Sequence, residues 1–214
     1  MKQGFAVMLM ALVLGQPAAF AADTQAAAPG AVASGPEGPA DTVAGFHATL
    51  VEIMQRGSEL GCNGRNQRVG GFVETGFDLP FIAQRVLKQH WKELSAAQQA
   101  QFTAQMKDLT AWSYASNFSQ HSGESFTTLG ATELPRDQRL VRTRLNLPGR
   151  DAVSFDYWLR QSGGRWRIIN VIADGVSDLA LRTTQYDRLI AEKGVNGLLG
   201  ALSGEIARLR SSCK

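Results

Sequence analysis

The chain has 214 residues, of which 44% are hydrophobic and 19% charged, and its formal net charge at pH 7 is +3. This length is sufficient for one domain with a substantial core. The charge is too small to indicate a nucleic-acid-binding protein, so no nucleic-acid partner is expected.

Residues 1–21 have the pattern of a secretory signal peptide. Lys2 precedes an apolar run over residues 5–14, and an Ala-x-Ala sequence ends at Ala21. The run is too short to span a bilayer, which needs about 20 residues. We therefore expect these residues to be removed during export.

Residues 22–40 are rich in Ala, Gly and Pro and contain almost no branched or aromatic side chains. Such a segment buries too little apolar surface to offset its ordering entropy, so it is predicted to be a flexible tether. A single domain is expected over residues 41–214.

The first half of this domain has the apolar spacing of helices. Between residues 43 and 54, apolar side chains recur at steps of three and four, which predicts a helix with Asp41 as its N-cap. A second, shorter helix is expected over residues 65–75.

Two capping signals follow. Asp78 and Pro80 suit the N-cap and first turn of a third helix. Ser95 and Gln98 form a capping-box pattern, which predicts that the longest helix covers residues 96–119.

From residue 124 the pattern alternates with a period of two, as in strands. Strands are predicted over residues 125–133, 139–147, 152–161 and 165–173, with turns at residues 148–150 and 163–164. The predicted fold class is therefore α+β, with a helical layer packed on a twisted antiparallel sheet of about four strands.

The turn lengths also predict how the strands pair. The first turn should pair Val141 with Tyr157, Thr143 with Phe155 and Leu145 with Val153, and the second should pair Leu159 with Ile168, Tyr157 with Asn170 and Phe155 with Ile172. Both registers collect apolar side chains on one face. Asn170 would be a polar residue on that face. It is expected either to bond to the Tyr157 hydroxyl or to contact the polar end of a ligand.

The last predicted strand is apolar on both faces, which indicates that it is covered on both sides. C-terminal helices over residues 178–192 and 196–210 can provide one cover. Half of the arginines fall between residues 136 and 167. They form either a solvated sheet face or a surface that docks anionic lipid or a partner protein.

No residue pattern indicates a metal or cofactor. The histidines, His47, His90 and His121, lack ligand spacing. Asp174, Ser177 and Asp178 form a polar cluster that suits a turn followed by a helix N-cap, with a hydrolytic site as the alternative. Cys62 and Cys213 could form a disulfide in an oxidising compartment, or remain apart if the chain keeps their Cα atoms out of reach.

Several stretches together resemble the periplasmic lipid-binding proteins of the MlaC/toluene-tolerance family. They are F-D-L-P at residues 77–80, Trp91, the Ser95/Gln98 capping box, Tyr114, W-R-I-I-N-V at 166–171, D-G-V-S at 174–177, Tyr186, K-G-V-N-G-L at 193–198 and Leu202. The sequences of the motifs D-G-V-S-D-L-A and F-D-L-P are most similar to those of the family branch associated with hopanoid biosynthesis. One departure is Asn170, where relatives commonly carry Asp.

The resemblance implies a monomeric, non-enzymatic periplasmic carrier that encloses lipid acyl chains in an apolar cavity. Its ligand would be a phospholipid or a hopanoid, its partners membrane-embedded lipid transport complexes of an ABC type, and it would use no cofactor. The expected lipid-binding residues are Phe77, Ile82, Trp91, Phe102, Met106, Tyr114, Phe118, Val141, Leu145, Phe155, Tyr157, Ile168, Asn170, Ile172 and Val176.

Two other classes of protein remain open from the residues alone. One is a small α+β enzyme that uses Asp174, Ser177 or Asp178. The other is a scaffold protein whose apolar residues simply form a filled core.

Overall fold

The computed structural model describes residues 38–213. In chain order the elements are α1 (Pro39–Gln55), α2 (Gly57–Gly76), α3 (Leu79–Leu87), the 3-10 helix η1 (Lys88–Glu93), α4 (Ala96–Asn117), β1 (Ser125–Leu134), β2 (Gln138–Asn146), β3 (Val153–Ser162), β4 (Arg165–Ala173), β5 (Val176–Ser177) and α5 (Asp178–Ser212). The predicted signal peptide and most of the predicted tether lie outside the described residues. The last two residues of that tether, Pro39 and Ala40, belong to α1.

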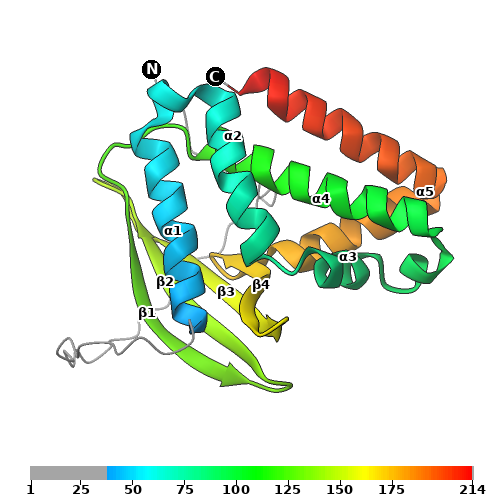
Figure 1. The fold of residues 1–214 in the computed structure, drawn as a ribbon, viewed down its shortest axis with the longest axis horizontal. Helices are drawn as coiled ribbons and strands as arrows, with labels where there is room; N and C mark the ends of the chain where they lie inside the picture. The colour runs from blue at the N-terminus through cyan, green and yellow to red at the C-terminus, as the bar shows by residue number, and fades with distance from the viewer. Residues whose placement is uncertain (1–37, 214) are drawn as a thin grey trace, which may run out of the picture.

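The fold is α+β, as predicted. One antiparallel sheet has the strand order β1-β2-β3-β4-β5, with β5 as a fifth, two-residue strand beyond the about four expected. Helix α1 crosses one face of this twisted sheet, and α2, α4 and α5 lie beyond it (Figure 1). The helices therefore form a layer against the sheet, and the buried side chains of both layers meet between them.

The predicted capping signals hold at three of four helices. Asp78 accepts a hydrogen bond from the Phe81 N–H, Ser95 and Gln98 form a reciprocal capping box, and Ser177 accepts from the Ala180 N–H. The prediction that Asp41 is the N-cap of α1 is wrong. Gly38 occupies that position, and the Asp41 carboxylate accepts a hydrogen bond from the Gly38 N–H at 2.8 Å.

Helix α2 begins at Gly57 and is longer than the predicted 65–75. Its first part has weak helical propensity and contains Gly61 at φ 58°, where the helix kinks. Tertiary contacts hold this part in place. The buried Arg65 guanidinium donates to the carbonyl oxygens of Gly57 and Ala115 at 2.8 and 3.0 Å.

The pairing of β2 with β3 is confirmed in full: Val141 lies opposite Tyr157, Thr143 opposite Phe155 and Leu145 opposite Val153. This hairpin places alternate residues of both strands against the helices. Along β2, Val141, Thr143 and Leu145 are buried, while Arg142 and Arg144 are exposed on the other face.

The predicted pairing of β3 with β4 is wrong beyond its first pair. Leu159 lies opposite Ile168 as predicted, but Tyr157 lies opposite Val171 and Phe155 opposite Ala173. The cause is a bulge in β4, where Ile169 has no partner in β3. Side chains alternate between the two faces of a sheet along each strand. The bulge therefore places Asn170 and Ile172 on one face of the sheet and Tyr157 on the other.

Strand β4 is covered at its free edge as well as on its faces. Strand β5 pairs with its last two residues, and Phe77 forms a parallel bridge with Ile168. The Asp78 N–H also donates to the Ile168 carbonyl at 3.0 Å. This cover explains why Ile168 and Ile169 are both fully or almost fully buried.

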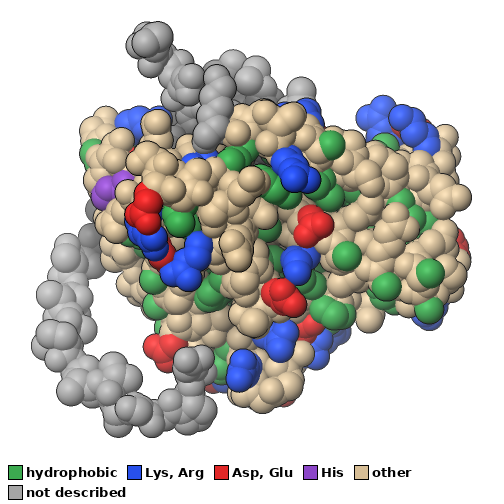
Figure 2. Space-filling model, turned by 45° about the horizontal axis from the view of Figure 1, so that its top comes forward, with side chains coloured by type: hydrophobic (Ala, Val, Ile, Leu, Met, Phe, Trp, Pro, Cys, Tyr) green, Lys and Arg blue, Asp and Glu red, His purple; other side chains and the backbone are tan. Residues whose placement is uncertain are grey.

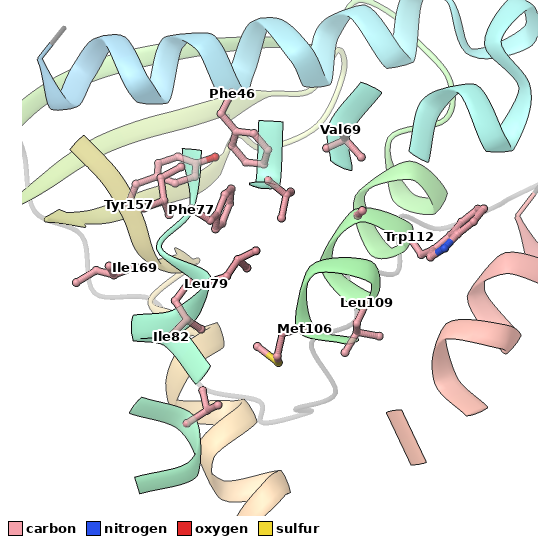
Figure 3. Close-up of a cluster of buried hydrophobic side chains, with 14 of the residues drawn as sticks. Phe46, Val69, Phe77, Leu79, Ile82, Met106, Leu109, Trp112, Tyr157 and Ile169 are labelled. Atoms are coloured by element: carbon pink, nitrogen blue, oxygen red, sulfur yellow. The ribbon is translucent and has the colours of Figure 1, made fainter. Parts of the chain in front are cut away.

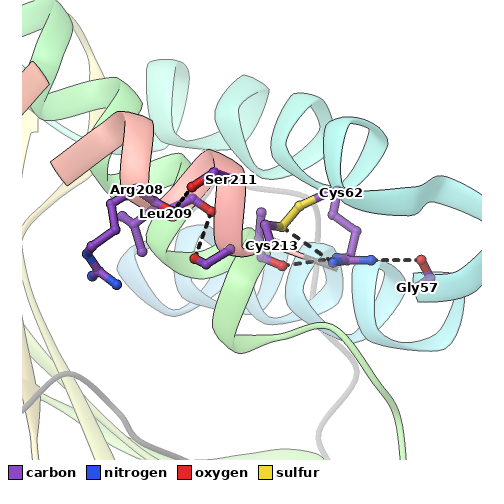
Figure 4. The surroundings of a disulfide bond; sticks show 9 residues. Gly57, Cys62, Arg208, Leu209, Ser211 and Cys213 are labelled. Atoms are coloured by element: carbon purple, nitrogen blue, oxygen red, sulfur yellow. Dashed lines mark hydrogen bonds between the residues drawn. A yellow bond between two sulfur atoms is a disulfide. The ribbon is translucent and has the colours of Figure 1, made fainter. Parts of the chain in front are cut away.

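Helix α5 runs from Asp178 to Ser212 with a kink at Gly194, whose φ is 67°. The kink separates the two C-terminal helices that the sequence predicts. A disulfide joins Cys62 in α2 to Cys213 at the end of α5, with a Cα–Cα distance of 5.8 Å (Figure 4). Of the two alternatives for the cysteines, the structure has the disulfide, and this bond links α2 to the end of α5 within the helical layer.

The surface is mixed in charge. On the face shown in Figure 2, cationic and anionic side chains are interspersed. Within residues 38–213, no helix is long and apolar enough to cross a membrane. The same residues contain no group of three or more His, Cys, Asp and Glu side chains that could hold a metal ion.

Candidate functional site

One continuous cluster of buried apolar side chains fills the space between the sheet and the helices and continues between the helices, and Figure 3 shows part of it. Ten of the predicted site residues belong to it: Phe77, Ile82, Phe102, Met106, Phe118, Val141, Leu145, Phe155, Tyr157 and Ile168. Trp91 and Tyr114 are half-buried and pack against the same cluster. We call this cluster the apolar interior.

Phe46 lies at the centre of the apolar interior. Its ring is 5.1 Å from that of Phe72 in a stacked arrangement. It meets three further rings edge-on: Phe77 at 5.3 Å, Tyr114 at 5.0 Å and Tyr157 at 6.1 Å. Aromatic pairs of this kind prefer such offset and edge-to-face contacts. The sequence predicts Phe46 only as part of the apolar face of a helix, and it was not among the predicted lipid-binding residues. Its spacing from the other apolar residues nevertheless places it on the buried face of α1.

One polar pair lies inside the apolar interior. The His47 Nε2 atom and the Tyr157 hydroxyl are 3.0 Å apart, and the His47 ring stacks on Phe126 at a centroid distance of 3.9 Å. Burial lowers the pKa of His47 from 6.5 to about 4, so the imidazole is neutral at pH 7. Burial also raises the pKa of Tyr157 well above its ordinary value.

His47 was not among the predicted site residues. The signal that could have found it is its spacing, because it lies four residues after Val43 and three before Leu50 on the buried stripe of α1. A histidine on an apolar stripe needs a polar partner. Here that partner is a tyrosine from the sheet, and a single sequence gives no indication of such a long-range pair.

Asn170 does not bond to Tyr157 as expected. Its side-chain oxygen accepts hydrogen bonds from the Leu179 N–H at 3.0 Å and from the Ser177 hydroxyl at 3.2 Å. Asn170 is buried beside the start of α5, on the face of the sheet that does not carry the Tyr157 side chain. An aspartate at this position could accept the same two hydrogen bonds.

The other two predicted site residues at this end also lie outside the apolar interior. Ile172 and Val176 are half-buried, and neither belongs to the apolar cluster. The bulge in β4 explains Ile172, because it turns this side chain away from Tyr157. Val176 lies in β5 opposite Ala173, at the margin of the sheet.

The polar cluster at residues 174–178 makes structural contacts. The Ser177 hydroxyl caps α5, Asp178 forms an ion pair with Arg182 at 2.7 Å, and the Asp174 carboxylate accepts from the Ser154 N–H at 2.9 Å. Each side chain stabilises a turn or a helix end. These contacts account for the cluster without a reaction.

Among residues 38–213, two of the pockets lie outside the apolar interior. One, of about 630 Å³, runs between α4 and α5 and is lined by Gln105, Asp108, Ser203, Ile206, Ala207, Arg210 and Ser211. The other, of about 230 Å³, is lined by Phe81, Arg85, Arg136, Gln138 and Arg160. The expected lining of the apolar cavity is instead packed side chain against side chain, so a ligand could enter there only if the sheet and the helices moved apart.

The contacts between α1 and the sheet, which we call the seam, are few in kind. Helix α1 reaches the sheet through the His47–Tyr157 pair and through the Thr42 hydroxyl, which donates to the Trp166 carbonyl at 3.2 Å. The rest of the contact between α1 and the sheet is apolar. The disulfide joins two helices, so it does not fasten the helical layer to the sheet.

Comparisons with known proteins agree with this architecture. A protein-family model described as "MlaC protein" matches residues 46–204, which is well over half of the chain. Among solved structures, a phospholipid-binding protein from Ralstonia solanacearum, determined in complex with a phospholipid, matches with a TM-score of 0.68. The two chains are 21% identical, and the match covers 78% of this chain and 96% of the other.

Proposed function

The chain belongs to the MlaC family, and from that premise we propose that it is a periplasmic lipid carrier without enzymatic activity. Its ligand is a phospholipid or a hopanoid, whose apolar part binds between the sheet and the helices. The carrier moves this lipid between envelope membranes as the soluble component of an ABC-type transport system. It acts as a monomer and takes its ligand from, and delivers it to, membrane-embedded complexes.

The observation that carries the proposal is the apolar interior itself. Each CH₂ group of a lipid costs about 0.8 kcal/mol when exposed to water, so a long-chain lipid crosses an aqueous compartment only in an apolar enclosure. Both layers of this fold contribute large apolar side chains to one continuous cluster. The structural similarity to a protein determined with a phospholipid supports this use of the fold.

The arrangement of covalent links favours opening at the seam. The disulfide between Cys62 and Cys213 keeps the helical layer together, whereas apolar contacts hold most of α1 against the sheet. Apolar contacts are non-directional and can be replaced by acyl chains at little cost. We propose that lipid entry separates these two layers and that the twelve predicted residues in or against the apolar interior then contact the ligand.

A matched pair of leucines in β2 tests the location of the lipid. Leu145 is buried in the apolar interior, while Leu140 lies half-buried on the opposite face of the same strand. Asparagine has nearly the shape of leucine, but burying its amide without a partner costs about 1–3 kcal/mol. The proposal predicts that Leu145→Asn lowers the amount of bound lipid about tenfold and that Leu140→Asn leaves it unchanged.

The measurement is native mass spectrometry, with lipid extraction, of protein exported to the periplasm and purified without detergent. Circular dichroism establishes that both variants are folded. If wild-type protein carries no lipid and takes none up from vesicles, the proposed function is wrong. If Leu145→Asn is folded and carries a normal load, the lipid lies elsewhere.

A further inference from the structure

Three arginines gather around the smaller pocket, outside the apolar interior. Arg85 comes from α3, Arg136 from the turn between β1 and β2, and Arg160 from β3. The remaining lining residues are Phe81 and Gln138, so no carboxylate lines the pocket. Segments more than seventy residues apart in the sequence therefore bring three positive charges to one concave site.

One aromatic ring positions two of these charges. The Arg160 guanidinium carbon lies 4.5 Å from the centre of the Phe81 ring, and that of Arg85 lies 5.8 Å from it. Cation–π contacts of this kind are favourable, but they do not neutralise the cations. The Phe81 ring is itself fixed near the start of α3, whose N-cap is Asp78. Two guanidinium groups thus contact the same ring at the margin of the pocket.

The negative charge nearby is insufficient to balance this group. Asp78 forms an ion pair with Arg160, in which its Oδ2 atom lies 3.5 Å from the guanidinium group without forming a hydrogen bond. Within residues 38–213, neither Arg85 nor Arg136 forms an ion pair. Arg167 stands directly opposite Arg160 in the sheet, and its buried Nε atom has no hydrogen-bond partner. Like charges directly opposite each other in a sheet are destabilising.

The turn that presents Arg136 is also unfavourable by itself. Arg136 has a φ of 63°, in a region that residues other than Gly, Asn and Asp rarely adopt, and the Asp137 that follows has a φ of 53°. Unfavourable backbone conformations of this kind cluster at ligand sites. A strained turn residue, two arginines on one aromatic ring and an excess of positive charge therefore lie at one place in the fold.

We infer that the pocket formed by Arg85, Arg136 and Arg160 binds a phosphate group. Guanidinium groups match phosphate oxygens with two parallel hydrogen bonds each, and these charge-assisted bonds are about twice as strong as neutral ones. The volume of about 230 Å³ is that of several water molecules, at about 30 Å³ each. A phosphate would also add negative charge beside Arg85 and Arg136, which form no ion pair within the described residues, since Asp78 pairs with Arg160 alone.

The phosphate can come from a phospholipid headgroup at a membrane surface or from a free phosphate ion. The chemistry that recognises it is the same in both cases. The site goes beyond the proposed carrier function, since it lies outside the apolar interior and needs no lipid bound there.

Two double variants with equal loss of charge test the site. Arg85→Gln/Arg136→Gln removes the two exposed arginines of the pocket and leaves the Arg160–Asp78 contact in place. Arg142→Gln/Arg144→Gln removes two exposed arginines from β2 that do not line the pocket. Both variants change only exposed side chains, so both are expected to fold.

Binding is measured at low ionic strength, where charges are least screened. One arm titrates inorganic phosphate by calorimetry, and the other measures flotation with phosphatidylcholine vesicles that contain or lack phosphatidylglycerol. We expect the pocket variant to bind at least about tenfold more weakly and the β2 variant to bind as the wild type does. Phosphate binding identifies a free ion as a sufficient source, while binding confined to phosphatidylglycerol vesicles identifies the headgroup.

Two results would overturn the site. The first is that wild-type protein binds neither probe. The second is that both double variants lose binding equally, which would indicate general attraction to basic protein. The lipid load of the apolar interior, measured on the same samples, should be normal in both variants. That measurement separates failure of this site from failure of the carrier function.

Discussion

The buried histidine makes the stability of this protein depend on pH in a way that can be calculated. Burial lowers the pKa of His47 from 6.5 to about 4 in the folded protein, whereas an unfolded chain leaves it near its ordinary value. Between these values, the unfolded state binds a proton that the folded state does not. The contribution is therefore fully present above pH 6.5 and is lost as the pH falls toward 4.

The size of this loss follows from the same values. Each pKa unit corresponds to about 1.4 kcal/mol, so the whole shift is worth about 3 kcal/mol. About 2 kcal/mol of it should already be lost between pH 7 and pH 5. That window lies above the ordinary pKa range of most carboxylates, so their titration interferes little.

The assay is urea unfolding followed by tryptophan fluorescence, with free energies extrapolated to water at both pH values. His47→Gln cannot ionise and retains a group that can bond to the Tyr157 hydroxyl. It should lose about 2 kcal/mol less than the wild type on going from pH 7 to pH 5. His90→Gln is the matched control, since His90 lies beside Glu93 outside the apolar interior, and it should keep the pH dependence. If wild type and His47→Gln lose the same free energy, His47 is not buried in the neutral form.

Two further predictions concern how the helical layer is fixed. Replacing Cys62 and Cys213 by serine opens a loop with a sequence separation of 151, which in the chain-entropy model lowers the free energy of unfolding by about 5 kcal/mol. Calorimetry should give a melting temperature about 10–20 °C lower, and reduction of the wild type should have the same effect; a change of a few degrees would refute it. Asn170→Leu removes the acceptor of the Leu179 N–H and should cost about 1–3 kcal/mol in urea unfolding. Asn146→Leu, whose amide bonds only to side-chain hydroxyls at the sheet surface, should cost less than about 0.5 kcal/mol, and equal costs would contradict the capping role.

Local signals in the sequence predicted most of this fold. The capping residues Asp78, Ser95 and Ser177 act at short range, so their roles can be read from a few neighbouring residues. The three-residue turn at Pro148 likewise determines the β2–β3 register, because a hairpin with no bulge has one pairing for a given turn. These predictions are confirmed since each depends on a contact within a few residues.

One error was local, since the N-cap of α1 is Gly38 and not Asp41. The other errors occur where a distant part of the chain decides the local structure. The bulge at Ile169 lies where β4 contacts Phe77 and α5, so the residues next to it in the sequence do not predict it. It reversed the predicted orientation of Asn170 and Ile172. The start of α2 was missed for the same reason, because Arg65 holds it through the carbonyl of Ala115, fifty residues away. His47 was considered only as a metal ligand, and its contact with Tyr157 was not predicted because Tyr157 lies in another layer.

The same bulge has a consequence for the proposed carrier. The bulge turns Asn170 away from Tyr157, so that the Asn170 amide bonds to the start of α5. The polar contact between α1 and β3 in the apolar interior is then the neutral His47–Tyr157 pair. A neutral pair whose members satisfy each other is far cheaper to bury than a charge. It can also be exchanged for a ligand's polar atom without exposing an ion. The helices are held together by a disulfide, and α1 is held against the sheet by apolar contacts, the Thr42–Trp166 hydrogen bond and one neutral pair. Such a fold is stable when closed and inexpensive to open, which is what a lipid carrier requires.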